Sequence, residues 1–449
     1  MFAHRAKQLR HNMRASTSDA TSFGLMVGIG ETYLPAFALA VGLGEVTAGL
    51  VGSLPLAVGG VLQGVSPWIL RRGVSEQAWV VGASVLQTVA FAPLIAAALY
   101  GQISALALLL CASIYWGGGL ASGPAWNSWI EKLIPRSIRA NYFAARTRAA
   151  QIATAFGFMA AGLLLQWSRT YGAEVQAFAG LFTIAMLARV YSVVMLAVHR
   201  APTHTRTVGI GPTSKEEAAY DRSSGIGERN LIVYLVLVQG MVQISGPYFT
   251  PYMLRHLDLS YIAYAGLIAI AFLAKIIALG TWGRLAAKRG AEWLLLLGGA
   301  MILPLATFWI VSENYLWLLF IQAVNGFAWA AYELGFFLML FESVPIRRRV
   351  RMLTIYNMAN TLAWCGGALI GGLLLKQLGS NPSGYYTLFV VSSVGRCFAY
   401  AYLLSHRPHV FVAVRDIGFR ILGIRTNASV LETPILSSLD DHHLEDSKH

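Results

Sequence analysis

The sequence contains few charged residues and lacks any cysteine pattern. Charged side chains make up 12% of its 449 residues, whereas 56% are hydrophobic. Soluble domains carry about 25% charged residues, so this chain has too little polar surface for a soluble enzyme or a soluble nucleic-acid-binding protein. Its three cysteines, Cys111, Cys365 and Cys397, lie in apolar runs, which excludes a disulfide framework and a zinc-ligand spacing. We find no nucleophile or phosphate-loop motif either, and expect no enzymatic activity, no cofactor and no bound metal.

The sequence consists largely of long apolar runs. A helix needs about 20 apolar residues to cross the hydrocarbon of a bilayer. Runs of this kind occupy residues 20–41, 46–69, 78–100, 105–130, 147–167, 177–198, 230–253, 260–282, 293–311, 316–341, 352–377 and 385–404. We therefore predict an all-α, polytopic membrane protein with twelve transmembrane helices, surrounded by membrane lipids.

One long polar insert divides the chain into two halves. Residues 199–229 are rich in Gly, Pro, Ser and Thr, a composition typical of linkers. We predict a six-helix bundle over 1–198, a cytoplasmic linker over 199–229, a second six-helix bundle over 230–405 and a cytoplasmic tail over 406–449. Within the tail, apolar residues at helical spacing in 410–425 indicate an interfacial helix, and the acidic sequence after it is typical of disorder.

The basic residues are distributed asymmetrically between the loops. If both termini are cytoplasmic, 28 of the 34 Lys and Arg residues lie in cytoplasmic segments and 3 in outer loops. Lys and Arg accumulate in the cytoplasmic loops of membrane proteins. We therefore predict a multi-pass protein of the inner (cytoplasmic) membrane with both termini inside. The net charge of +13 is then a signal of membrane orientation and does not indicate nucleic acid as a partner.

The two halves contain a weak internal repeat. Shifting residues 135–165 by 210 positions gives nine gap-free identities in 31 positions. They include Pro135 with Pro345, Arg139 with Arg349, Gly157 with Gly367 and Gly162 with Gly372. These matches fall in a basic loop and the helix after it, as expected for two parallel six-helix repeats.

Two six-helix halves joined by a long cytoplasmic loop resemble the major facilitator superfamily, over about residues 18–405. The loop signature of that family, Gly-x-x-x-Asp-x-x-Gly with adjacent basic residues, has counterparts at 66–73 and 283–290. Leu70 and Ala287 stand at the aspartate position of these two counterparts. The charge latch attributed to the motif is therefore not expected here.

Two further motifs bear on the branch of the family. Residues 157–162 correspond to the antiport motif Gly-Pro-x-x-Gly-Gly but carry Phe158 in place of proline, which argues against antiport. Residues 123–130, Gly-Pro-Ala-Trp-Asn-Ser-Trp-Ile, resemble a bacterial branch of the superfamily. The resemblance implies two pseudo-symmetric bundles, a monomer, and a cavity lined by helices 1, 4, 7 and 10.

Ionisable side chains inside apolar spans are functional candidates, because each costs free energy unless it is paired or faces water. We predict Glu31, near the middle of the first span, and Glu333, in the tenth, as proton-coupling carboxylates. A structural ion pair is the alternative for Glu31. Lys275, in the eighth span, should lie at the depth of Glu333 and either pair with it or face an anionic substrate. Arg189 and Arg396, in the sixth and twelfth spans, should bind backbone carbonyls or buried polar groups.

The candidate substrate site consists of polar and aromatic side chains in the cavity-lining and flanking helices. Besides Lys275, the set comprises Trp126, Asn127, Gln239, Gln243, Asn325, Trp329, Tyr332, Tyr356 and Asn360. Such side chains suit a small solute of aromatic or amphipathic character.

Three functions fit these observations. The first is a secondary active transporter that moves a small solute by alternating access and is coupled to protons. The second is a membrane assembly or pigment-delivery factor that keeps the fold without turnover, and the third is a lipid flippase. Charges in cavity-lining helices favour transport, whereas the missing loop aspartates favour the other two.

The loop charges lead to a topology prediction. A reporter fused within residues 199–229 should be cytoplasmic, because the bias of 28 basic residues against 3 fixes the orientation. Periplasmic labelling of a cysteine placed in the same insert would contradict it.

Overall fold

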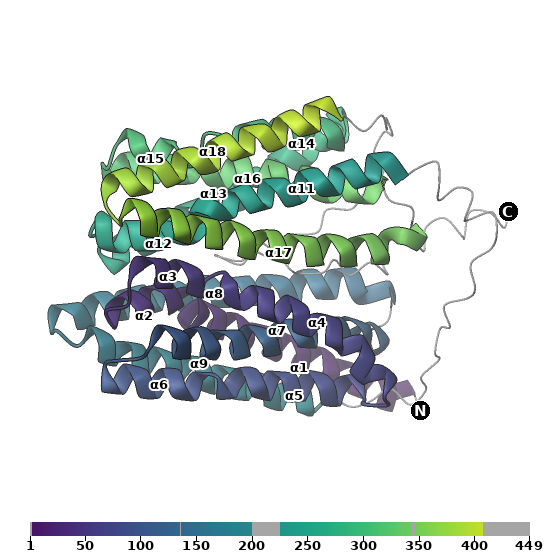
Figure 1. The fold of residues 1–449 in the computed structure, drawn as a ribbon. Coiled ribbons are helices and arrows are strands. Elements are labelled where there is room, and N and C mark those ends of the chain that lie inside the picture. Colours follow the sequence, from purple (N-terminus) through teal and green to yellow (C-terminus); the bar gives the residue numbers. More distant parts are fainter. Residues whose placement is uncertain (1, 135, 200–224, 344–345, 407–449) are drawn as a thin grey trace. The chain divides into compact units, whose positions relative to one another are not determined.

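The structure is a computed structural model that describes residues 2–134, 136–199, 225–343 and 346–406. All regular secondary structure in these residues is helical (Figure 1). Most of the predicted linker and the predicted tail helix at 410–425 lie outside the described residues.

The described residues form two compact units, residues 2–43 with 58–199 and residues 44–57 with 225–406. The helices of the first unit are α1 (Phe2–Ile29), the 3-10 turn η1 (Glu31–Tyr33), α2 (Leu34–Ala40), α4 (Leu54–Arg71, in this unit from Val58), α5 (Glu76–Val89), α6 (Phe91–Tyr100), α7 (Ala105–Leu133), α8 (Arg136–Thr170) and α9 (Glu174–Ala197).

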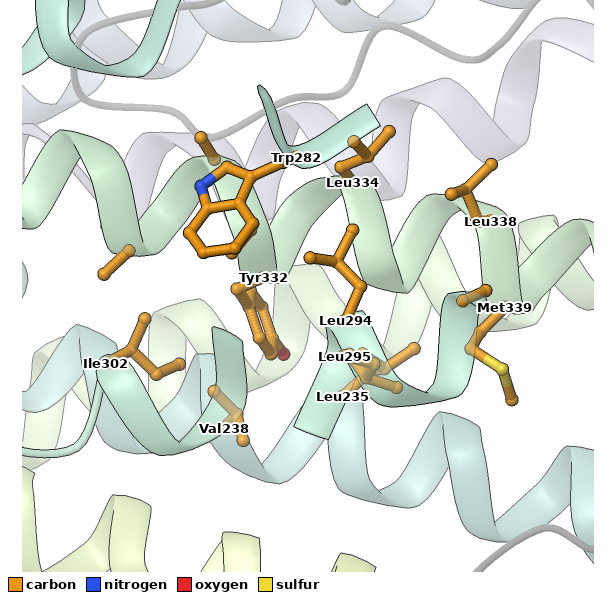
Figure 2. Close-up of a cluster of buried hydrophobic side chains, with 14 of the residues drawn as sticks. Leu235, Val238, Trp282, Leu294, Leu295, Ile302, Tyr332, Leu334, Leu338 and Met339 are labelled. Atoms are coloured by element: carbon orange, nitrogen blue, oxygen red, sulfur yellow. The ribbon is translucent and has the colours of Figure 1, made fainter. Parts of the chain in front are cut away.

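The helices of the second unit are α3 (Glu45–Val51), α11 (Gly225–Ser245), the 3-10 turn η2 (Gly246–Tyr248), α12 (Phe249–Pro251), the π-turn η3 (Tyr252–His256), α13 (Tyr261–Arg289), α14 (Ala291–Met301), α15 (Phe308–Val311), α16 (Tyr315–Ser343), α17 (Ile346–Leu378) and α18 (Pro382–Ser405). Its core contains aliphatic and aromatic side chains of α11, α13, α14 and α16 (Figure 2), among them Leu235, Val238, Trp282, Leu294, Leu295, Tyr332 and Leu338.

Ten helices in the described part of the chain are long and apolar enough to cross a membrane. The run predicted at 293–311 forms two pieces, α14 and α15, with Pro304 between them, because proline has no N–H to continue a helix. The run predicted at 316–341 forms the 29-residue helix α16, in which Gln322, Asn325 and Glu333 lower the apolar content. The all-α, multi-pass prediction is confirmed, and the count of twelve stays a prediction.

Short polar residues set the start of several helices. The side chains of Ser75, Ser104, Ser260 and Asn381 each accept a hydrogen bond from a backbone N–H in the first turn of α5, α7, α13 and α18. Such caps satisfy N–H groups that the helix itself leaves free. The local sequence thus fixes where these spans begin.

The first long helix of each unit is broken in the same way. The turn η1 separates α1 from α2, and the turn η2 ends α11. At each break a buried tyrosine donates a hydrogen bond to the neighbouring helix: Tyr33 to the carbonyl of Phe158 at 2.9 Å, and Tyr248 to that of Ala368 at 2.6 Å. Phe158 and Ala368 differ by 210 positions, the shift of the sequence repeat, so the two halves also repeat in structure.

In the first unit, glycines bring the backbones of α1 and α8 into contact. A Cβ on Gly24 would overlap the carbonyl oxygen of Ala150, and a Cβ on Gly28 would overlap that of Thr154. We call this contact the α1–α8 seam. It requires residues without a side chain at these two positions of α1.

The seam can be tested with a matched pair of glycine substitutions. Gly28→Ala should destabilise the protein by about 1–3 kcal/mol, because the added methyl must push two backbones apart. Gly180→Ala in α9, where a Cβ meets nothing within 4 Å, should be neutral or slightly stabilising. Thermal unfolding of the purified variants measures both, and equal melting temperatures would refute the close seam.

Candidate functional site

The predicted coupling residue Glu31 lies in the break of the first span. It is 9% exposed and forms the start of η1. The hydroxyl of Tyr115, from α7, donates a hydrogen bond to Glu31 Oε2 at 2.7 Å. The ring of Phe91 packs edge-on against Tyr115 with centroids 5.4 Å apart. The carboxyl group is therefore held by a neutral donor inside the bundle. Sequence reasoning missed Tyr115, although its polar hydroxyl within the run 105–130 was a signal.

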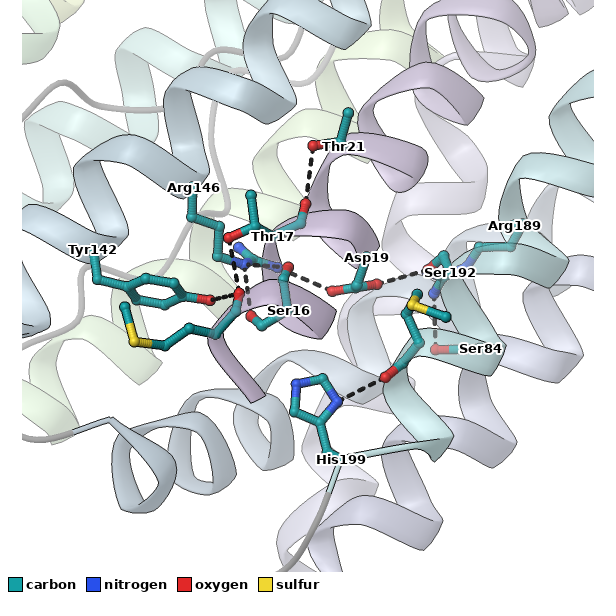
Figure 3. Close-up of polar contacts among 12 residues, drawn as sticks. Ser16, Thr17, Asp19, Thr21, Ser84, Tyr142, Arg146, Arg189, Ser192 and His199 are labelled. Carbon is teal, nitrogen blue, oxygen red and sulfur yellow. Dashed lines mark hydrogen bonds and ion pairs between the residues drawn. The ribbon is translucent and has the colours of Figure 1, made fainter. Parts of the chain in front are cut away.

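A polar network connects four helices of the first unit (Figure 3). Arg146 of α8 forms an ion pair with Asp19 of α1 at 3.1 Å, and Ser192 of α9 donates to the other oxygen of Asp19 at 2.7 Å. Arg189 donates to Ser192 at 2.6 Å and to Ser84 of α5 at 2.8 Å. Asp19 thus bonds to Arg146 directly and is connected to Arg189 through the hydroxyl of Ser192. Sequence reasoning missed Asp19 because it lies one residue before the first predicted span.

His199 lies beside this network, after the end of α9. Its Nδ1 is 2.8 Å from the carbonyl oxygen of Met195, and its ring packs against Trp129 with centroids 5.1 Å apart. Burial lowers the pKa of His199 from its ordinary value of 6.5. The imidazole is therefore neutral at pH 7 and adds no third cation near Asp19.

The structure confirms the expectation for the two symmetric arginines. Besides its contacts in the network, Arg189 lies over the ring of Phe23. Arg396 donates to the carbonyl of Ile302 at 2.9 Å and to the hydroxyls of Ser392 and Ser245 at 3.0 and 3.3 Å. Both guanidinium groups bind buried polar groups of their own unit.

Lys275 and Glu333 form an ion pair in the second unit. Lys275 Nζ of α13 lies 2.5 Å from Glu333 Oε2 of α16, and the two side chains are 11% and 13% exposed. The helices approach closely nearby, where a Cβ on Gly326 would overlap the carbonyl oxygen of Ala271. Of the two alternatives for Lys275, this structure contains the pair with Glu333.

The other predicted substrate-binding residues of α16, together with Tyr356 of α17, lie near the Lys275–Glu333 ion pair or in the core of the second unit. Tyr332 and Tyr356 are buried and near enough to Glu333 to interact with its charge. Trp329 packs edge-on against Tyr332 with centroids 5.5 Å apart. Asn325 donates to the side chain of Gln322 at 3.0 Å.

The candidates of the first unit belong to a different environment. Trp126 of α7 lies under the guanidinium of Arg146, 4.4 Å from its ring centroid, and packs edge-on against Phe143. Its neighbour Asn127 is half-buried. A role for either in substrate binding stays a prediction.

Gln239 and Gln243 of α11 and Asn360 of α17 are buried where these two helices pack together. Gln239 Oε1, Asn360 Oδ1 and the indole Nε1 of Trp364 have no hydrogen-bond partner among the described residues. Buried polar atoms without a partner are rare in proteins. These three atoms therefore mark a place where bonding capacity is unused.

The sequence was compared with family profiles and with curated proteins. The family profile described as Major Facilitator Superfamily matches residues 231–431. No curated protein matches the chain in sequence.

Several solved structures share the fold. A variant of the nucleoside transporter NupG has a TM-score of 0.68 at 13% identity, with 88% of this chain and 100% of that chain covered. A bacterial homologue of the human lysosomal transporter Spinster, inward-facing and unoccupied, has a TM-score of 0.66 at 15% identity and coverages of 90% and 97%. A POT family transporter in complex with a thioalcohol-conjugated peptide has a TM-score of 0.63 at 14% identity and coverages of 89% and 97%.

The ion pair of the second unit can be tested by a double-mutant cycle. Lys275→Met or Glu333→Gln alone should destabilise the protein by about 3–5 kcal/mol, because each leaves one buried charge unpaired. The double variant should recover much of this loss, and Lys288→Met, at an exposed position of the same helix, should have little effect. Additive losses in thermal unfolding would mean that the two side chains do not interact.

Proposed function

We propose that the chain is a member of the major facilitator superfamily, whose profile matches residues 231–431, and that it is a secondary active transporter that moves a small solute by alternating access and is coupled to protons. The bias of the loop charges supports a protein of the cytoplasmic membrane with both termini inside. The structural neighbours are named as transporters, which favours transport over a non-transporting assembly factor.

The observation that carries the coupling proposal is the environment of Glu31. The carboxyl group is buried in an apolar span, at a helix break, and accepts a hydrogen bond from Tyr115. A carboxylate away from water is costly, and protonation removes that cost. Access to water from one side of the membrane and then the other would therefore load and release a proton at this residue.

Glu333 is the second candidate for coupling. It forms an ion pair with Lys275 in this structure. Proton uptake by Glu333 would require the pair to open and would leave Lys275 without its counterion. Glu31 Oε2 accepts a hydrogen bond from the neutral hydroxyl of Tyr115.

The substitution Glu31→Gln tests the assignment, because it imitates the protonated carboxyl at nearly the same size. We expect the variant to fold and bind substrate, and to exchange substrate for substrate. Its uptake into liposomes should no longer respond to an imposed pH gradient. Glu292→Gln, in the first turn of α14, is the matched control and should respond as the unmodified protein does.

Full gradient-driven uptake by Glu31→Gln would show that Glu31 is not the coupling site and would transfer the assignment to Glu333. Loss of folding in the same variant would support the structural interpretation of Glu31 instead.

A further inference from the structure

Eight buried side-chain polar atoms of the second unit have no hydrogen-bond partner among the described residues, and we consider three of them, on α11 and α17. They are Gln239 Oε1, Asn360 Oδ1 and Trp364 Nε1, in side chains that belong to residues 6%, 4% and 5% exposed. A buried acceptor or donor without a partner costs free energy, and natural proteins tolerate it mainly where another molecule supplies the partner.

The three residues lie on facing sides of α11 and α17. Asn360, Trp364, Gly367 and Gly371 recur at spacings of three or four residues and so share one face of α17. A Cβ on Gly367 would overlap the carbonyl oxygen of Gly240, and one on Gly371 that of Ile244. This face of α17 is therefore turned toward α11.

The α1–α8 seam gives the register of this contact. The carbonyl of Leu25 lies against Gly157 in the first unit, as that of Gly240 lies against Gly367 in the second. Leu25 and Gly240 differ by 215 positions, as do Tyr33 and Tyr248, which make equivalent hydrogen bonds.

With these shifts, Gln239 and Gln243 stand where the first unit has Gly24 and Gly28. Likewise, Asn360 and Trp364 stand where it has Ala150 and Thr154. In the first unit these positions close the seam, with backbone against backbone. In the second unit, Gln239, Gln243 and Asn360 carry amide groups at these positions and Trp364 carries an indole. The same contact that seals one bundle is thus lined with bonding groups in the other.

We propose that this polar seam between α11 and α17 binds the transported solute, and that the solute is electrically neutral and carries both hydrogen-bond donors and acceptors, as a hydroxylated ring does. The inference rests on the proposed transport function. The unpaired oxygens of Gln239 and Asn360 require donors, whereas the N–H of Trp364 requires an acceptor.

The charge of the solute follows from the ionic groups of this unit. Lys275 is bound to Glu333, and Arg396 is bound to the carbonyl of Ile302 and to serine hydroxyls. An ionised solute in the seam would lose its hydration without gaining a counterion from these groups. A neutral solute avoids that cost.

Two tryptophan variants separate binding from structure. Trp364→Phe removes an N–H that has no partner among the described residues, so the melting temperature without ligand should hardly change, while affinity should fall about tenfold. Trp282→Phe is the matched control, since Trp282 is equally buried but donates to the carbonyl of Phe327 at 3.0 Å. It should lower the melting temperature and leave affinity unchanged. Gln239→Met and Asn360→Leu should repeat the loss of affinity independently.

The probes are two matched pairs, uridine with uridine monophosphate and D-glucose with D-glucuronate, titrated against the full chain in detergent. At least one neutral probe should bind, and its charged counterpart should bind about tenfold more weakly or not at all. The absence of binding by both neutral probes, equal binding of the charged partners, or an affinity of Trp364→Phe within about twofold of the unmodified protein would each overturn the proposal.

The binding titration uses no pH gradient, so its result does not depend on whether uptake in the liposome assay is coupled to protons. Neutral-probe binding in a protein whose uptake ignores the pH gradient would refute proton coupling and leave the seam assignment intact.

Discussion

The structure depends on one constraint, which is that a polar group inside the bilayer must find its partner within the protein. Water is absent from the hydrocarbon, and an unpaired charge there is costly. The ion pairs Asp19–Arg146 and Lys275–Glu333 and the serine contacts of Arg189 and Arg396 all satisfy this requirement. Because these bonds connect neighbouring helices, they also determine which helices pack together within each unit.

The same constraint explains how the two halves diverged. Both units retain a tyrosine at the break of their first long helix, bonded to a backbone carbonyl of the neighbouring helix. The polar side chains around this shared hydrogen bond differ between the two units. The first unit has Glu31 where the repeat places Gly246, and the second has Gln239 where the first has Gly24. A repeated scaffold therefore carries a protonatable group in one copy and neutral bonding groups in the other.

This division suits a coupled transporter. A carboxyl group that gains and loses a proton changes its preference for water, whereas amides and an indole keep their bonding character at every physiological pH. Separate groups allow the proton and the solute to be bound by different chemistry.

The sequence by itself determined the membrane class, the helical architecture, the polar insert and the repeat, because hydrocarbon thickness and helical geometry act on local composition. It also placed Glu31, Lys275 and Glu333 inside apolar runs, where the cost of charge makes any residue conspicuous. Sequence reasoning missed Asp19 and Tyr115, since an aspartate at the edge of a span and a tyrosine within one are common and do not by themselves reveal a partner. Only the tertiary structure decided that Asp19 pairs with Arg146 and accepts a hydrogen bond from Ser192, that Tyr115 donates to Glu31, and that the N–H of Trp364 has no partner among the described residues. The physical reason is that a hydrogen bond depends on which helix faces are brought together, and those contacts join residues far apart in the chain.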